Sequence, residues 1–442
     1  MTEIKTEQKE QEKKGRPAIF KDSNFRWMIG GGAISMLGDQ FTLIALPWLV
    51  LKMTGDTLIL GMVLALISVP RALFILIGGA LVDRYSPKTV MMQTKYINTI
   101  LLGILSALIF AGRLELWMVY TLALGLGIST AFSIPSGTSM LPRVVQAAQL
   151  QSANGIMLGV RQFTMFIGPV LAGVMIAVFG TQEKGGLSDA NGLGAAFLFD
   201  CFTYAFSAWT LSRVKMNESS VAGKPITNGQ AATGTHLLQT VIDGLRYCWN
   251  EKQLRSCFIY WAAIAFFIMG PIQIALPVMA NQLSNSASAL GLLAGAHGAG
   301  TLLGMAVSGM KPGLRFGNLG RTILLIDFVV GILFIPMGLI TASWQGALIL
   351  LTVGALGGFL HVSVFTWIQR QVPPNMIGRA MSMFMFIFMG IGPVSAAVTG
   401  WLLRSVSIPQ LFMTSGTLLI AIVLLAIGIS PMREVTDQLL PG

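Results

Sequence analysis

The sequence predicts an all-α membrane protein with twelve transmembrane helices, arranged as two parallel six-helix pseudo-repeats. Three observations support this prediction: the composition, the recurrence of long apolar stretches, and an internal repeat. Of the 442 residues, 54% are hydrophobic and only 11% are charged, whereas charged residues make up about a quarter of a typical soluble domain. Water is therefore not the main environment of this chain.

Apolar stretches of about 20 residues or more recur along the whole chain. Each is long enough to cross a hydrocarbon core of about 30 Å as an α-helix. An even number of such spans places both ends of the chain on one side of the membrane. The predicted spans are residues 27–52, 57–82, 89–111, 115–140, 150–180, 190–212, 254–281, 287–310, 320–341, 344–369, 378–403 and 408–431.

The distribution of basic residues indicates which loops lie on which side of the membrane. Most of the 29 Lys and Arg residues fall in one set of tails, loops and flanking turns, and basic residues gather on the cytosolic side of membrane proteins. We therefore expect a multi-pass protein of the cell membrane with both termini in the cytosol. The net charge of +11 is spread over many short loops, which argues against a nucleic-acid partner. The outer loops hold Lys52, Arg113, Lys184 and Arg404, and Arg71 and Arg161 lie within spans.

Aligning the chain with itself reveals the repeat. Ile44–Pro47 in the first span returns as Ile274–Pro277 in the seventh, and Ile167–Val170 in the fifth returns as Ile391–Val394 in the eleventh. Two matches in the same order, at about half the chain length, indicate a duplicated six-helix unit. The predicted organisation is a cytosolic tail 1–26, a six-helix bundle 27–212, a cytosolic interdomain loop 213–253, a second bundle 254–431 and a cytosolic tail 432–442.

The loop after the second span carries Gly79, Asp83, Arg84 and Lys88. Gly79 permits close helix approach, Asp83 can cap the positive N-terminus of a neighbouring helix, and the basic residues hold the loop in the cytosol. This string resembles the signature loop of the major facilitator superfamily. In that family, the helix whose N-terminus the aspartate contacts is the eleventh span. Here that span begins near Arg379, so the resemblance implies a cytosolic latch between the halves. A basic anchor loop without a latch is the alternative.

Further strings resemble the branch of this superfamily that includes macrolide-efflux proteins and the enterobactin exporter. They follow in order as Gly38–Asp39, Leu141–Pro142, Asp200 with Thr203, and Gly244–Tyr247. The resemblance implies a secondary transporter in which two halves alternate access to a midplane site. The fourth span, Leu116–Met140, contains no arginine, so the proton-linked arginine of better-known drug antiporters is not carried over.

The fifth span contains Gly168, Pro169 and Gly173, and Gly392 and Pro393 repeat the pattern in the eleventh. The first of these strings resembles the glycine-proline motif of antiporters in the superfamily. Glycine lets helices approach closely, and proline frees a backbone carbonyl and can bend a span. Ordinary close packing accounts for the glycines equally well.

Charged residues within spans are the most informative feature, because each costs about 2.5 to 3.5 kcal/mol at the centre of a membrane helix. Asp39 lies near the middle of the first span, on one helical face with Ser35 and Thr42. Arg71 lies at a similar depth in the second span and could pair with it. We expect either that Asp39 exchanges a proton while Arg71 adjusts the pKa of its carboxyl, or that the two form a static structural pair.

The remaining polar candidates are weaker. Arg161 could attract an anionic substrate group, pair with Asp39 or extend toward the cytosolic interface. Asp200 and Asp327 fall on spans six and nine, where a structural hydrogen-bonding role is favoured over coupling. His361 shares a face of the tenth span with glycines and could titrate near neutral pH, although a packing role is the default.

Together these features favour a proton-coupled exporter of amphipathic small molecules, either drug- or macrolide-like or siderophore-like. A lipid or lysolipid flippase on the same fold is the main alternative. A membrane enzyme or sensor is disfavoured because no catalytic motif or soluble domain is recognisable. The expected partners are a small-molecule substrate, protons and the lipid bilayer. No cofactor or metal is expected, since the three cysteines lack ligand-like spacing.

The two halves differ in chemistry. Gly309 matches Gly79, but the following Met310–Gly317 contains no aspartate. Most charges within spans also lie in the first half. We therefore expect the N-terminal half to carry the latch and any ion coupling, and the C-terminal half to supply mainly the opposite wall of the cavity.

Overall fold

A computed structural model describes eight stretches of the chain. These are residues 19–84, 86–146, 149–180, 189–216, 251–284, 286–311, 313–372 and 377–435. Some helical side chains are also outside the description, at residues 72, 75–84, 151, 252–253, 377–383 and 385–389. The predicted tails and the predicted interdomain loop lie largely outside the described residues.

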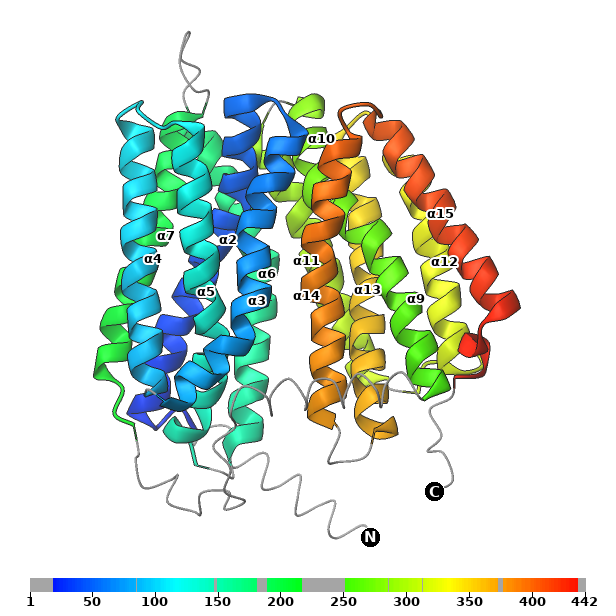
Figure 1. Cartoon of the computed structure of the whole chain (residues 1–442), viewed down its shortest axis with the longest axis horizontal. Coiled ribbons are helices and arrows are strands. Elements are labelled where there is room, and N and C mark those ends of the chain that lie inside the picture. Colours follow the sequence, from blue (N-terminus) through cyan, green and yellow to red (C-terminus); the bar gives the residue numbers. More distant parts are fainter. Residues whose placement is uncertain are drawn as a thin grey trace. The chain divides into compact units, whose positions relative to one another are not determined.

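The first half of the chain forms six long helices. Their order follows the predicted spans, and each bound falls within a few residues of the prediction. They run side by side in Figure 1. The helices are α2 Ser23–Thr54, α3 Thr57–Arg84, α4 Pro87–Phe110, α5 Leu116–Val144, α6 Leu150–Phe179 and α7 Ala190–Arg213.

The second half forms six further spans. The first of them is continuous but contains a π-helical turn, η3 Pro271–Ala275, between α9 Lys252–Gly270 and α10 Leu276–Ser284. Such turns widen a helix locally and are frequent at functional sites. The others are α11 Ala287–Met310, α12 Leu319–Met337, α13 Ser343–Gln371, α14 Ile377–Leu402 and α15 Ile408–Ile429, followed by the short η4 Pro431–Glu434.

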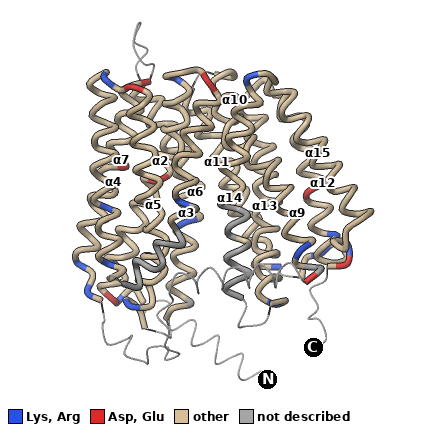
Figure 2. The backbone as a smooth tube through the Cα atoms, in the orientation of Figure 1, with Lys and Arg blue, Asp and Glu red and all other residues tan. Residues whose placement is uncertain are grey.

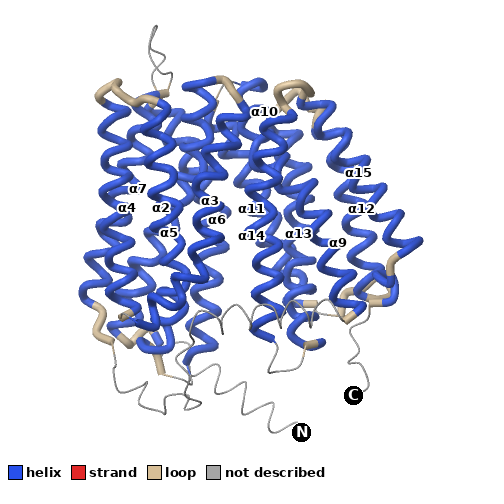
Figure 3. The backbone as a smooth tube through the Cα atoms, viewed as in Figure 1, coloured by secondary structure: helices blue, strands red, loops and turns tan. Residues whose placement is uncertain are grey.

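The described part of the chain is almost entirely helical, as Figure 3 shows. Within the described residues, nine helical segments are long and apolar enough to cross a membrane. The remaining long helices are α3, α7 and α14. In α3 and α14 several side chains lie outside the description, and α7 carries more polar residues than most of the other spans, among them Asp200 and Thr203. The all-helical membrane fold predicted from the sequence is thus confirmed.

Contacts between residues divide the chain into two compact units. Their boundaries differ from those of the two halves of the sequence, because a segment of the first half belongs to the second unit. The first unit is Met1–Leu46 with Val69–Asn228, and the second is Pro47–Ser68 with Gly229–Gly442. The hairpin formed by the end of α2 and the start of α3 therefore packs with the second unit.

Small residues bring helices together inside each unit. In the second unit, a Cβ atom added to Gly300 would lie 2.0 Å from the Leu351 carbonyl oxygen, and one on Gly304 would lie 1.8 Å from that of Ala355. Only glycine permits α11 and α13 to approach so closely, which is a common way for membrane helices to pack. Gly300 and Gly304 therefore serve the packing of these two helices.

Charged residues lie mainly near helix ends in both units, as Figure 2 shows for the described residues. At the end where α4 begins, the first unit carries Lys88, Arg143 and Arg213; near the start of α12, the second carries Arg321 and Arg433. Few charges lie along the middle of the helices. Those few define the site described next.

Candidate functional site

Asp39 occupies the middle of α2 in the first unit. Its Oδ1 accepts a hydrogen bond of 2.5 Å from the Tyr204 hydroxyl of α7, although its side chain remains exposed. An ionisable group at mid-span is tolerated where it faces water and not lipid. Asp39 is thus held on one side by Tyr204 and remains accessible on the other.

A second carboxyl, Asp200, lies one turn before Tyr204 on the same face of α7 and is fully buried, with 1% of its surface exposed. The Thr42 hydroxyl donates to its Oδ2 over 2.5 Å, and the Thr203 hydroxyl donates to its Oδ1 over 3.0 Å. The hydrogen-bonding role expected for Asp200 agrees with these contacts. They also place it beside the coupling candidate Asp39, which was not expected.

Gly38 explains why the two strings Gly38–Asp39 and Asp200–Thr203, far apart in sequence, meet in space. A Cβ atom at Gly38 would lie 2.1 Å from Thr203 Oγ1 and 2.3 Å from Asp200 Oδ1. Two turns earlier, a Cβ at Gly31 would lie 1.8 Å from Thr210 Oγ1. These two glycines on one face of α2 let α7 approach closely, so the polar groups of the two helices meet.

Lys95 of α4 completes this group and was missed by the sequence analysis. It is only 5% exposed, its Nζ donates to Ser35 Oγ over 2.7 Å, and it lies 4.6 Å from the centre of the Tyr204 ring. Its charge acts on both Asp39 and Asp200. Lys95 lies only about two turns from the start of its span, where a basic residue is expected to be a cytosolic anchor. The run Thr94, Lys95 and Asn98 on one helical face was the signal that could have revealed it.

Asn98, one turn beyond Lys95, adds a buried amide. Its side chain is fully buried, and neither its nitrogen nor its oxygen makes a hydrogen bond of normal geometry in the structure, although it lies near the Tyr204 hydroxyl. Buried polar groups are usually satisfied by protein or by ordered water. This part of the site is therefore suited to hold water.

Two arginines lie at the margin of this group. The charge of half-buried Arg71 in α3 acts on Asp39 and on Arg161 of α6, and Arg161 itself is exposed. No direct ion pair joins Arg71 to Asp39 among the described residues. The charge of Arg71, the candidate partner predicted from the sequence, therefore acts on Asp39 without direct contact, whereas Tyr204 contacts it directly.

His361 lies in the second unit, on α13. Its ring stacks on Phe365 with 6.3 Å between centroids and lies 5.8 Å from the ring of Phe384. The same unit holds a buried acid, Asp327 of α12, whose Oδ2 accepts a hydrogen bond of 2.8 Å from the Tyr260 hydroxyl. His361 is thus part of an aromatic cluster, and among the described residues Asp327 is hydrogen-bonded by Tyr260.

The hairpin between α2 and α3 forms polar contacts with the end of α14 inside the second unit. Arg404 Nε lies 3.2 Å from Asp56 Oδ1, and Arg404 Nη2 contacts Asp56 Oδ2. The Thr57 hydroxyl donates to the Gly400 carbonyl over 2.8 Å. Asp56 and Arg404 lie outside the helices, and the hydrogen bonds from Arg404 lower the pKa of Asp56 below its usual value.

The signature loop is only partly described. The side chains of Gly79, Asp83, Arg84 and Arg379 lie outside the described residues. Lys88 is described, and its Nζ donates to the carbonyls of Ser212 and Val214 over 3.2 Å and 2.7 Å. A cation at the last carbonyls of a helix is favourable, so Lys88 caps α7 within the first unit.

The glycine-proline residues pack closely. A Cβ at Gly168 would lie 2.5 Å from Gln40 Cβ on α2, so Gly168 brings α6 against the helix that carries Asp39. Pro169 and Gly173 are buried beside it. In the second unit a Cβ at Gly392 would lie 3.2 Å from Gln273 Nε2 in the π-helical turn, and Pro393 is buried.

Comparison with known proteins agrees with this architecture. The sequence profile of the Major Facilitator Superfamily matches residues 28–397. Macrolide efflux protein A of Streptococcus pyogenes is 22% identical over 91% of this chain and 95% of its own length. The enterobactin exporter EntS of Salmonella typhi is 24% identical over 80% of each chain. The crystal structure of a D-xylose-proton symporter superposes with a TM-score of 0.70 at 12% identity, over 96% of this chain and 100% of that one.

A helical membrane fold with ionisable groups at mid-span, and with relatives that export small molecules, defines a membrane transporter and not an enzyme. The chain belongs to the major facilitator superfamily.

Proposed function

We propose that this protein is a proton-coupled exporter of amphipathic small molecules that works by alternating access. The observation that carries the proposal is Asp39, an accessible carboxyl at mid-span that accepts a hydrogen bond from Tyr204, whose ring lies against Lys95. A charge there costs about 2.5 to 3.5 kcal/mol on insertion scales, so a residue of this kind in a transporter is a strong candidate for an ion-coupling role.

Protonation of Asp39 is the proposed coupling step. The ionised carboxyl accepts the Tyr204 hydrogen bond and balances the charge of Lys95; the protonated carboxyl is neutral and releases that charge. The balance between Asp39 and its cationic neighbours therefore changes when a proton binds. Arg71 acts on the same carboxyl, and in the proposed cycle it favours the ionised form once the proton has left.

The contacts of the α2–α3 hairpin support alternating access. Four polar groups, from Asp56, Thr57, Gly400 and Arg404, hold this hairpin against the end of α14. In the proposed cycle they close the outer side and separate when the outer side opens. Exposed ion pairs contribute little free energy each, which suits a contact that must break repeatedly.

The proposed orientation places both termini in the cytosol of a cell-membrane protein. It is supported by the basic residues at the ends where α4 and α12 begin, among them Lys88 and Arg321. The export direction and the substrate class are supported by the names of the relatives, a macrolide efflux protein and an enterobactin exporter.

Transport by everted membrane vesicles tests this proposal. Vesicles with and without the protein are energised with a pH gradient, and uptake is followed for a radiolabelled macrolide, a fluorescent cationic dye, a catechol iron chelator and a fluorescent lysolipid. We expect uptake of at least one of the first three, and its loss when the gradient is collapsed. Movement of the lysolipid alone would favour the flippase, and uptake that ignores the gradient would contradict proton coupling.

A further inference from the structure

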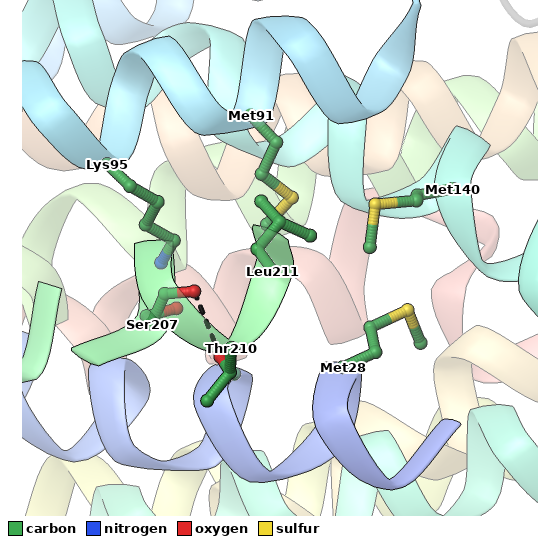
Figure 4. A pocket seen from close by; sticks show the side chains of 8 residues that line it. Met28, Met91, Lys95, Met140, Ser207, Thr210 and Leu211 are labelled. Carbon is green, nitrogen blue, oxygen red and sulfur yellow. Dashed lines mark hydrogen bonds between the residues drawn. The ribbon is translucent and has the colours of Figure 1, made fainter. Parts of the chain in front are cut away.

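A small cavity lies inside the first unit, beside Lys95. Its volume is about 30 Å³, and it is lined by residues of α2, α4, α5 and α7. Figure 4 shows Lys95 and Ser207 at one end of it and Met28 and Met140 at the other. A cavity needs roughly 10 to 15 Å³ to hold one water molecule, so this one has room for water.

The end of the cavity beside Lys95 is polar enough to bind that water. Lys95 has three N–H donors, of which one is used by Ser35. Thr210 donates its hydroxyl hydrogen to the Ser207 carbonyl over 2.9 Å, which leaves its oxygen lone pairs available as acceptors. The Ser207 hydroxyl also lines the cavity. These three side chains supply the two to four polar partners that a buried water requires.

The other end of the cavity reaches toward the ends of the helices. Met28 lies near the start of α2, Met91 near the start of α4 and Met140 near the end of α5. These methionines belong to or pack against an apolar cluster that includes Ile29 and Leu211. Methionine side chains are flexible and adapt to their surroundings. The cavity thus lies between Lys95 on one side and flexible methionine side chains on the other. Met28 precedes Asp39 by about 16 Å along α2.

We propose that Lys95 relays the proton of Asp39 to water in this cavity, so that protons reach the inner side through the interior of the first unit. In this step the Lys95 ammonium gives one proton to the cavity water, which carries it away as hydronium. The neutral amine then takes up, through water beside Asn98, the proton that leaves the Asp39 carboxyl, which becomes a carboxylate. Lys95 ends as it began, and Asp39 has lost one proton. This relay rests on the proton coupling proposed above.

The surroundings of Lys95 fit a relay. Lysine can release its proton in an apolar interior, whereas arginine keeps its charge. The carboxyls whose charges act on Lys95 are Asp39 of α2 and Asp200 of α7, and the Tyr204 ring lies against it. On the α5 side of α4 the described contacts are polar but uncharged: Ser133 donates to Thr94 over 3.1 Å.

The experiment uses the purified full-length protein in liposomes and a radiolabelled macrolide, with two assays. The first measures accumulation driven by an imposed pH gradient. The second measures exchange of labelled for unlabelled macrolide without a gradient, which requires only that the loaded protein reorient. For Lys95→Arg we expect at least a tenfold loss of driven accumulation and exchange within twofold of the wild type. Retention of driven accumulation, or loss of both activities, would overturn the relay.

Blocking the cavity is the second test. Gly32 lines the cavity, and a Cβ added to it meets no atom within 4 Å, so Gly32→Leu starts from open space and adds a bulky apolar group at the cavity wall. Gly30 also has open space around its Cβ position but does not line the cavity, which makes Gly30→Leu the matched control. Gly32→Leu should lose driven accumulation and keep exchange, while Gly30→Leu should keep both.

The two proposals fail in different ways. If the wild-type protein shows exchange but no accumulation with the gradient, the proton coupling itself is wrong. If the wild type accumulates the macrolide and Gly32→Leu does so equally well, coupling stands and the cavity is not the proton route.

Discussion

Lys95 in α4 and Asp327 in α12 occupy equivalent places in the two halves, each about two turns after the start of its helix and each 5% exposed. Lys95 lies among two carboxyls and a tyrosine, whereas Asp327 accepts one hydrogen bond from Tyr260. A group with several charged neighbours responds when one of them gains a proton; a group with one neutral partner is satisfied and static. The duplicated fold has thus kept a buried polar position in both halves, with different surroundings in each.

The largest effect that tests this comparison is expected for Asp39→Asn. Asparagine keeps the shape and a hydrogen-bond acceptor for Tyr204 but cannot exchange a proton. We expect loss of gradient-driven accumulation by at least tenfold, with downhill movement of the same probe retained, measured in proteoliposomes.

The matched control for that variant is Asp327→Asn in the second unit. Asparagine can still accept the hydrogen bond from Tyr260, so driven accumulation should remain within about twofold of the wild type. Equal losses in the two variants would remove the functional distinction between the halves, and uphill transport by Asp39→Asn would remove Asp39 from the coupling step.

The two tyrosines provide an intermediate test. Tyr204→Phe removes the hydrogen bond to Asp39, and bonds to charged groups are worth about 1.5 to 3 kcal/mol. We expect roughly a tenfold change in the rate of driven accumulation. Tyr260→Phe leaves buried Asp327 without this donor and should lower the free energy of unfolding by about 1 to 3 kcal/mol, seen as a lower melting temperature in detergent, with little change in transport.

A result in which Tyr260→Phe alters coupling as strongly as Tyr204→Phe would contradict this assignment. To separate coupling from folding, both variants should be compared in the exchange assay, which reports correctly folded protein without a proton gradient.

The sequence predicted the helices well because composition and apolar length determine which segments cross a membrane. It also singled out Asp39 and Asp200, since charges within spans are rare. It could not show that they lie together, because that depends on how Gly31 and Gly38 let α2 approach α7. Lys95 was missed because its distance from the helix start matched that of a basic anchor. Whether such a lysine extends to the interface or turns inward depends on its partner, Ser35.

The smallest effect is expected at the hairpin of the second unit, where Asp56 and Arg404 are joined at the protein surface. The Arg404 side chain is 49% exposed, and exposed ion pairs are weak. Reversing one charge, as in Arg404→Asp, should increase hydrogen–deuterium exchange in the hairpin Pro47–Ser68, with less than a twofold change in transport. The double variant Asp56→Arg with Arg404→Asp should restore protection.

The pH dependence of this pair has a definite sign. Its hydrogen bonds from Arg404 lower the pKa of Asp56 in the folded state, so the stabilisation is fully present above the usual aspartate pKa of about 3.9. It is lost only as the pH falls below that value and through the lowered pKa. Hairpin protection should therefore be constant between about pH 5 and pH 8. A loss of protection within that range, with the coupling cluster unchanged, would show that the hairpin responds to a group other than Asp56.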